Sequence, residues 1–141
     1  MTREEFKNRI GAAEDGQTVI LEDDGLAVSV EDGAGEGEIL VAADIGLLPA
    51  DAAERGLPGR MMAANDCFAE TAGGTISIDP ETSHVALQIT IWLDEFDFDT
   101  AMARIGAVVD KAVKWKAVLH PAEGGPDGAG EPVDGSWMIQ V

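Results

Sequence analysis

The clearest pattern in the chain is a strict alternation of apolar and other residues from His84 to Leu93. One set of alternate positions is entirely aliphatic: Val85, Leu87, Ile89, Ile91 and Leu93. The other set is mixed: Ala86, Gln88, Thr90 and Trp92. Because successive side chains of a β-strand point to opposite faces, this stretch is predicted to be a long strand with one buried face.

Shorter apolar runs predict the rest of a sheet. Thr18 to Asp23 is rich in β-formers, and Asp24-Gly25 after it is a strong hairpin turn signal. Leu26 to Val30 alternates, and Glu38 to Ile45 is a more continuous apolar run. Three consecutive strands with short turns indicate an antiparallel meander. A further short strand is predicted at Thr75 to Asp79, before the long one.

Three helices are predicted around these strands. Thr2 can cap a first helix, in which Phe6 and Ile10 share a face. Pro58 suits the first turn of a second helix, which continues to Glu70. Asp97 or Asp99 can cap the third helix, Thr100 to Leu119.

The second helix is apolar on two sides, which indicates contacts on two sides. One side carries Met61, Ala64 and Phe68, and the other carries Met62, Asn65 and Ala69. Gly73 and Gly74 follow it and can supply the positive φ of a sharp turn into the next strand.

The predicted fold class is α+β, with an antiparallel sheet of about five strands and three helices in the order α-β-β-β-α-β-β-α. Residues 1–119 form one domain. Residues 120–141 form a Gly/Pro/acidic tail that ends in the apolar SWMIQV. The sequence does not decide whether that last segment docks on the domain or is disordered.

A formal net charge of -18 over 141 residues argues against nucleic acid as a partner, because a duplex would be repelled and no counterions would be released. Lys and Arg are absent between Ile10 and Glu54 and between Met61 and Ala103. The predicted sheet is therefore acidic where it is polar. This is either a solvated surface or an electrostatic face for a partner segment.

Cysteine usage and hydropathy favour a cytoplasmic protein. Cys67 is the single cysteine, so an intramolecular disulfide is not possible. The first residues are charged and lack the apolar core of a signal peptide, and no apolar run is long enough for membrane insertion.

No motif for chemistry is found. Cys67, His84 and His120 lack zinc-ligand spacing, and the acidic loops lack the alternating ligands of a calcium loop. Cys67 fits better as a small buried apolar residue than as a nucleophile. We therefore predict no catalytic residue, no metal and no cofactor, and a protein that is not an enzyme.

Trp92 is the most notable single residue, because it stands on the second face of a strand whose first face is aliphatic. It is either covered by a helix or by the tail, or it is an anchor at a protein interface, where Trp is enriched.

The order of elements in an acidic chain of this size resembles the type III secretion chaperones of the Tir chaperone family. The similarity is strongest between Met61 and Leu93. There a helix ending in Met61-Met62-Ala63-Ala64-Asn65 is followed by the turn at Thr71 to Gly74, a short strand to Asp79 and the long strand.

This resemblance implies a homodimer that binds a segment of a secreted effector and keeps it non-globular before export, without nucleotide. The expected dimer or partner interface comprises Met61, Met62, Asn65, Phe68, Gln88, Thr90 and Trp92. The alternative is a regulatory or sensory α+β domain of similar topology without a secretion client.

Overall fold

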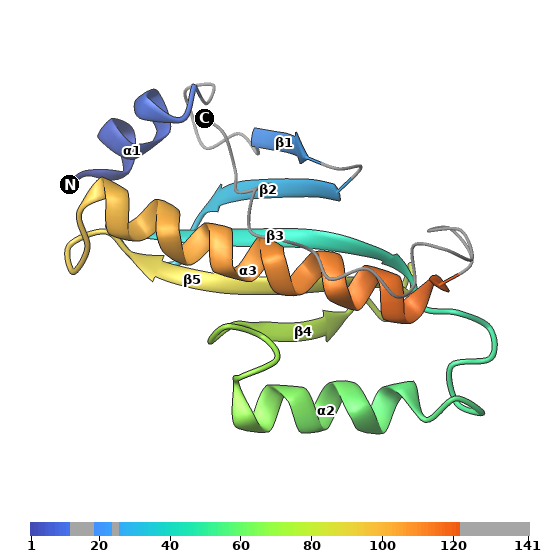
Figure 1. Cartoon of the computed structure of the whole chain (residues 1–141). Helices are drawn as coiled ribbons and strands as arrows, with labels where there is room; N and C mark the ends of the chain where they lie inside the picture. Colours follow the sequence, from blue (N-terminus) through green and yellow to red (C-terminus); the bar gives the residue numbers. More distant parts are fainter. Residues whose placement is uncertain (12–18, 24–25, 122–141) are drawn as a thin grey trace.

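The computed structural model describes residues 1–11, 19–23 and 26–121. These contain three helices and five strands (Figure 1). In chain order they are α1 (Arg3–Arg9), β1 (Val19–Asp23), β2 (Leu26–Asp32), β3 (Glu38–Leu47), α2 (Leu57–Cys67), β4 (Thr75–Ile78), β5 (His84–Trp92) and α3 (Phe98–Leu119). The predicted α+β class and element order are confirmed.

The five strands form one antiparallel sheet in the order β1-β2-β3-β5-β4. The first three strands are the predicted meander. The long alternating strand, β5, lies between β3 and the short edge strand β4. A β-bulge between Asp44 and Gly46 shifts the β3–β5 register near the end of β3.

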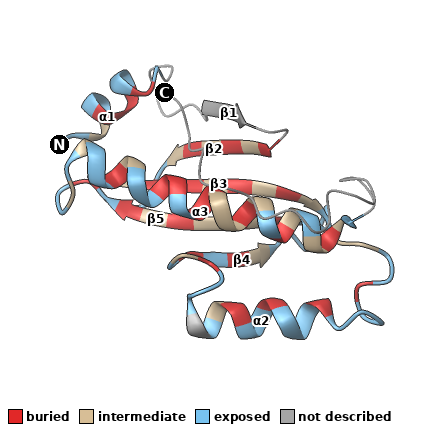
Figure 2. Cartoon of the chain, viewed as in Figure 1, coloured by how far each residue is buried: buried red, intermediate tan, exposed pale blue. Residues whose placement is uncertain are grey.

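Apolar and other residues alternate in the sequence of these strands, and buried and more exposed positions alternate in the same way in the sheet (Figure 2). In β5, the aliphatic positions from Val85 to Ile91 are buried, and the positions between them are partly exposed. Strands β2 and β3 show the same period of two. The buried face is almost purely aliphatic, as a chain with few aromatic residues requires.

Helix α3 lies across this buried face of the sheet (Figure 1). It begins at the N-cap Asp97, whose side chain accepts a hydrogen bond from the Thr100 backbone N–H at 2.7 Å. Hydrogen bonding with Thr100 lowers the pKa of the Asp97 carboxyl. The buried positions of α3 repeat at helical spacing: Ala101, Ile105, Val108, Val109, Ala112, Trp115 and Leu119.

Helix α1 docks at one end of the sheet. Thr2 and Glu5 form a capping box, and Phe6 is fully buried with its ring 5.7 Å from that of Phe98. Lys7 is also buried, at 6% exposure, and forms an ion pair with Asp32 at the end of β2. Helix α1 is therefore held to the sheet both by the buried side chains of Phe6 and Ile10 and by the Lys7–Asp32 ion pair.

Helix α2 lies beside the edge strand β4, outside the layer formed by α3 and the sheet (Figure 1). Leu57, Met61 and Ala64 face inward and are buried, whereas Met62 is 73% exposed. Of the two apolar sides predicted for this helix, one packs into the core and the other is exposed to solvent. The helix ends at Cys67, three residues before the predicted end, because Phe68 adopts a left-handed conformation.

The turn after α2 needs its two glycines for different reasons. Gly73 has a φ of +85°, as expected. Gly73 alone supplies the positive φ predicted for the pair, because Gly74 is not among the positive-φ residues. A Cβ at Gly74 would lie 2.7 Å from the Gln88 carbonyl oxygen, so this glycine permits β4 to approach β5.

Two predictions concern residues outside the described ranges. The Asp24-Gly25 hairpin turn is one, and the fate of SWMIQV within 122–141 is the other. The division into a domain of residues 1–119 and a tail of residues 120–141 stays a prediction.

Candidate partner-binding surface

The second face of β3 and β5 is the side of the sheet opposite α3. Its members, here called the open face, are the partly exposed Leu40, Ala42, Asp44, Ala86, Gln88 and Thr90 together with Trp92, which is 48% exposed. The strand register brings them together, since Leu40 pairs with Thr90, Ala42 with Gln88 and Asp44 with Ala86. Gln88, Thr90 and Trp92, predicted as interface residues, are thus contiguous.

Two exposed apolar side chains mark the ends of the open face. Trp92 pairs with Glu38 at the start of β3, and Leu47, at the end of β3, pairs with His84. Between them the surface is made of small, apolar and uncharged polar groups, with Asp44 as its acidic member. Such a surface can accept apolar side chains from another chain without burying an unpaired charge in its centre.

The indole of Trp92 is fixed in orientation by a hydrogen bond. Its Nε1–H donates to Glu38 Oε1 at 2.8 Å, and the other carboxylate oxygen of Glu38 accepts from the Gly35 backbone N–H at 3.1 Å. The polar edge of the ring is therefore satisfied, while much of its apolar surface remains exposed. An aromatic side chain that is already ordered loses little entropy on binding.

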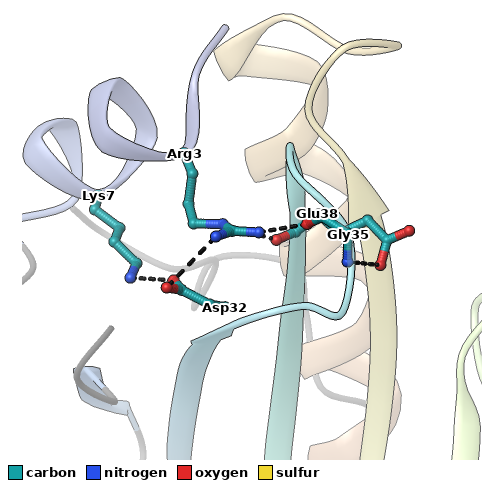
Figure 3. Close-up of polar contacts among 5 residues, drawn as sticks. All are labelled: Arg3, Lys7, Asp32, Gly35 and Glu38. Atoms are coloured by element: carbon teal, nitrogen blue, oxygen red, sulfur yellow. Dashed lines mark hydrogen bonds and ion pairs between the residues drawn. The ribbon is translucent and has the colours of Figure 1, made fainter. Parts of the chain in front are cut away.

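Helix α1 supports this arrangement through the β2–β3 turn (Figure 3). The Arg3 guanidinium donates to the carbonyl oxygens of Glu38, at 3.1 Å, and of Gly35, and it lies 3.5 Å from the Asp32 carboxylate. Lys7 pairs with the same carboxylate. A chain of polar contacts therefore runs from α1 through the turn to Trp92.

Asn65 of α2 holds the edge of β4. Its side-chain amide donates to the Ile76 carbonyl oxygen at 3.0 Å and accepts from the Ile76 backbone N–H at 2.7 Å. This pair of bonds imitates a neighbouring strand at the middle of β4. The edge is thereby occupied at Ile76, so an added strand would have to displace α2 there.

The remaining predicted interface residues divide by burial. Met61 is 3% exposed and belongs to the core, so it offers almost no surface to a partner. Met62 and Phe68 are exposed, and Asn65 is half-buried with its amide engaged by β4. The structure thus places Met62 and Phe68 on or just after α2, apart from the open-face group.

Sequence reasoning missed Glu38, Leu47 and Ile78. Glu38 belongs to the site because its carboxylate accepts the Trp92 indole hydrogen bond. This contact depends on the β3–β5 register, which the sequence did not predict. Leu47 and Ile78 are exposed apolar ends of strands whose register was not predicted.

Replacing Asn65 with leucine should lower the free energy of unfolding by about 1–2 kcal/mol, because both Ile76 backbone groups lose their partner. Urea unfolding measures this. Asp66→Leu, at the next and exposed position of α2, is the matched control and should change stability by less than about 0.5 kcal/mol. Equal stability of the Asn65→Leu variant and the wild type would show that the amide does not hold the strand edge.

Neither a metal-binding group nor a membrane-spanning helix is found in the described part of the chain. No cluster of three or more His, Cys, Asp or Glu side chains there is arranged to hold a metal ion. None of the helices in those ranges has the length and apolar character needed to cross a bilayer.

Comparison with known families decides the assignment. The model of the Tir chaperone protein (CesT) family matches residues 4–116, which span α1 to most of α3. The chain belongs to the Tir chaperone family. The resemblance seen in the sequence is thereby confirmed. The match includes α2, the β4 edge and the open face.

Solved structures agree with the family assignment at the level of the fold. The crystal structure of the ExsC–ExsE complex matches with a TM-score of 0.62 and 21% identity, over 82% of this chain and 88% of that one. The heterodimeric ExoU–SpcU complex from the type III secretion system of Pseudomonas aeruginosa matches with a TM-score of 0.61 and 20% identity, over 84% and 95%.

The HopA1–SchA chaperone–effector complex gives a TM-score of 0.56 and 15% identity, over 84% and 89% of the two chains. No match is found among curated protein sequences. At these identities the structural likeness shows that this Tir chaperone family member has the family's fold.

Proposed function

We propose that this Tir chaperone family member is a non-catalytic type III secretion chaperone that binds a segment of a secreted effector and keeps it non-globular in the cytoplasm before export. Family membership supports the class of function. The observation that supports the position of the binding site is the open face. It is a contiguous, partly exposed surface with an ordered, half-exposed tryptophan at one end.

The dimensions of the open face suit an extended segment. From Glu38 to Leu47 the strand spans about 30 Å at roughly 3.3 Å per residue. A partner segment of similar length could place apolar side chains against Trp92 and Leu47 and between them. Because β3 and β5 are interior strands, such a segment would bind through its side chains, and pockets for alternate side chains would provide specificity.

Charge favours a basic partner segment. The strands β2 to β5 contain no Lys or Arg, and Asp44 and Glu38 lie on or beside the open face. Acidic groups near an apolar surface steer a basic chain toward it and repel an acidic one. We therefore expect the affinity for the effector segment to fall as ionic strength rises.

Met62 is the residue that best supports a homodimer. It is 73% exposed on the outer side of α2, in a helix whose opposite side is already in the core. A two-fold contact between copies of α2 would bury the same methionine from both subunits. Such a contact would give α2 the two-sided packing expected from the sequence.

Replacing Met62 with glutamate should shift the dimer to monomer by placing two like charges across the two-fold contact. Size-exclusion chromatography with light scattering over a dilution series measures the change, expected to be a tenfold or larger rise in the dimer Kd, equivalent to about 1.4 kcal/mol. Ala63→Glu adds the same charge at the neighbouring exposed position and is the control.

A dimer unaffected by Met62→Glu would place the two-fold contact elsewhere. A monomeric wild type at all concentrations would contradict the homodimer. Neither result would by itself remove the open-face binding site, because that surface lies on β3 and β5.

The second candidate is a regulatory or sensory domain of the same topology. It would use the same fold without an extended client. Binding of a non-globular effector segment to the open face is expected only for the chaperone, so the affinity of the chain for such a segment distinguishes the two.

A further inference from the structure

A basic pocket lies between α2 and the second half of α3, away from the open face. Arg60 of α2 and Lys111 and Lys114 of α3 line it, around Trp115 and Val118, with Glu70 at its border. Its volume is about 210 Å³. Three cations against one carboxylate make this an unusual site in a chain with a net charge of -18.

The pocket is an ordered structure rather than a chance gathering of exposed cations. The Trp115 Nε1–H donates to the Glu70 carbonyl oxygen at 2.9 Å, and the Arg60 guanidinium lies 5.4 Å from the centre of the Trp115 ring. Lys111, Lys114, Trp115 and Val118 follow the i, i+3, i+4, i+7 spacing of one helical face. The indole thus forms a fixed wall with cations around it.

The charges of this pocket are incompletely paired. Lys114 has a partly exposed ion pair with Asp110, at 3.6 Å on the same helix. Within the described ranges, Arg60 and Lys111 have no ion-pair partner. Such a site favours an acidic segment whose carboxylates can pair with several cations.

The chain itself contains such a segment immediately after α3. Residues 117–141 include no Lys or Arg, and the acidic residues among them are Glu123, Asp127, Glu131 and Asp134. Val118, which lines the pocket, is three residues before Pro121, the last described residue. Attachment to α3 gives the segment an effective concentration on the order of millimolar at the pocket, so weak charge pairs suffice.

We propose that the acidic segment 122–134 is the occupant of the Arg60–Lys111–Lys114 pocket and pairs with these cations in cis. The open face attracts basic chains, so an effector segment suited to it is poorly suited to this pocket. The segment of the chain itself has both the required charge and the required position. The exclusion of an effector segment from this pocket rests on the proposed function, whereas the charge and the position of the acidic segment do not.

The Trp115 indole N–H is the reporter for the test, because it lies in the pocket wall. In the full chain, the four acidic residues of the segment are neutralised together (E123Q, D127N, E131Q and D134N), and ¹H–¹⁵N spectra are recorded. The indole signal is assigned with Trp115→Phe. A control variant removes the same number of charges from exposed sites elsewhere, namely E4Q, E36Q, E81Q and E95Q.

We expect the Trp115 indole signal to move in the neutralised variant and to stay in place in the control variant. The same four substitutions should have no further effect when Arg60, Lys111 and Lys114 are all glutamine, because the cations that transmit the effect are then absent. The Trp92 indole signal should remain unchanged throughout, which shows that the sheet is intact.

An unmoved Trp115 signal in the neutralised variant would overturn the proposal. An equal movement in the Arg60→Gln/Lys111→Gln/Lys114→Gln background would also overturn it, since the effect would then not depend on these cations. If the signal moved only when an effector segment was added, the pocket would be a partner site and the proposal would be wrong.

Discussion

Replacing Trp92 with alanine should weaken the binding of an effector segment by about 30-fold or more, equivalent to about 2 kcal/mol. The reason is that the indole is exposed at the end of the open face yet already ordered by Glu38, so its apolar surface contributes to binding with little loss of entropy. Isothermal titration of the full chain with the N-terminal segment of a secreted effector that it binds measures the change.

Two further variants separate the ring from its hydrogen bond. Trp92→Phe keeps an aromatic ring and should recover much of the affinity. Glu38→Ala leaves the indole in place but removes its orientation, so we expect an intermediate loss. The free energy of unfolding should change little in Trp92→Ala, since the side chain is half-exposed. Affinity within twofold of the wild type would show that Trp92 is not an anchor.

Replacing Asp32 with alanine should lower the free energy of unfolding by about 2 kcal/mol, because it leaves the buried Lys7 ammonium without its counter-charge. The loss of a partner from a fully buried pair costs about 3–5 kcal/mol, and we expect less here because Asp32 is partly exposed. Arg3 also loses a contact at 3.5 Å. Urea unfolding at neutral pH measures the change.

The sharper test of this ion pair is the double variant Lys7→Met/Asp32→Ala. Methionine fills the space of the lysine stem without a charge, so the double variant should be more stable than Asp32→Ala alone. If the two substitutions simply added, Lys7 would not depend on Asp32, and α1 would be held by Phe6 and Ile10 alone.

How far the sequence predicted the fold depends on how local each signal was. The alternation from Val85 to Leu93 required only neighbouring positions, and it gave both the strand and its buried face. Likewise, the capping residues Thr2 and Asp97 act within one helical turn and were predictable.

The contacts that shape the proposed site could not be predicted because they join distant residues. Glu38 and Trp92 are 54 positions apart and meet only through the β3–β5 register. Asn65 was expected at the dimer or partner interface, and only the structure reveals that its amide is engaged by Ile76. The sequence places Met61 and Met62 on different sides of the second helix, but it does not say which side meets the core.

The most direct test of the central claim is an NMR titration of the full chain with the unlabelled effector segment. Our account predicts that the largest shifts fall on the open face, at Leu40, Gln88, Thr90 and the Trp92 indole. Signals of the buried face should move less. Binding that leaves the open-face signals unchanged, or no binding at all, would contradict the account.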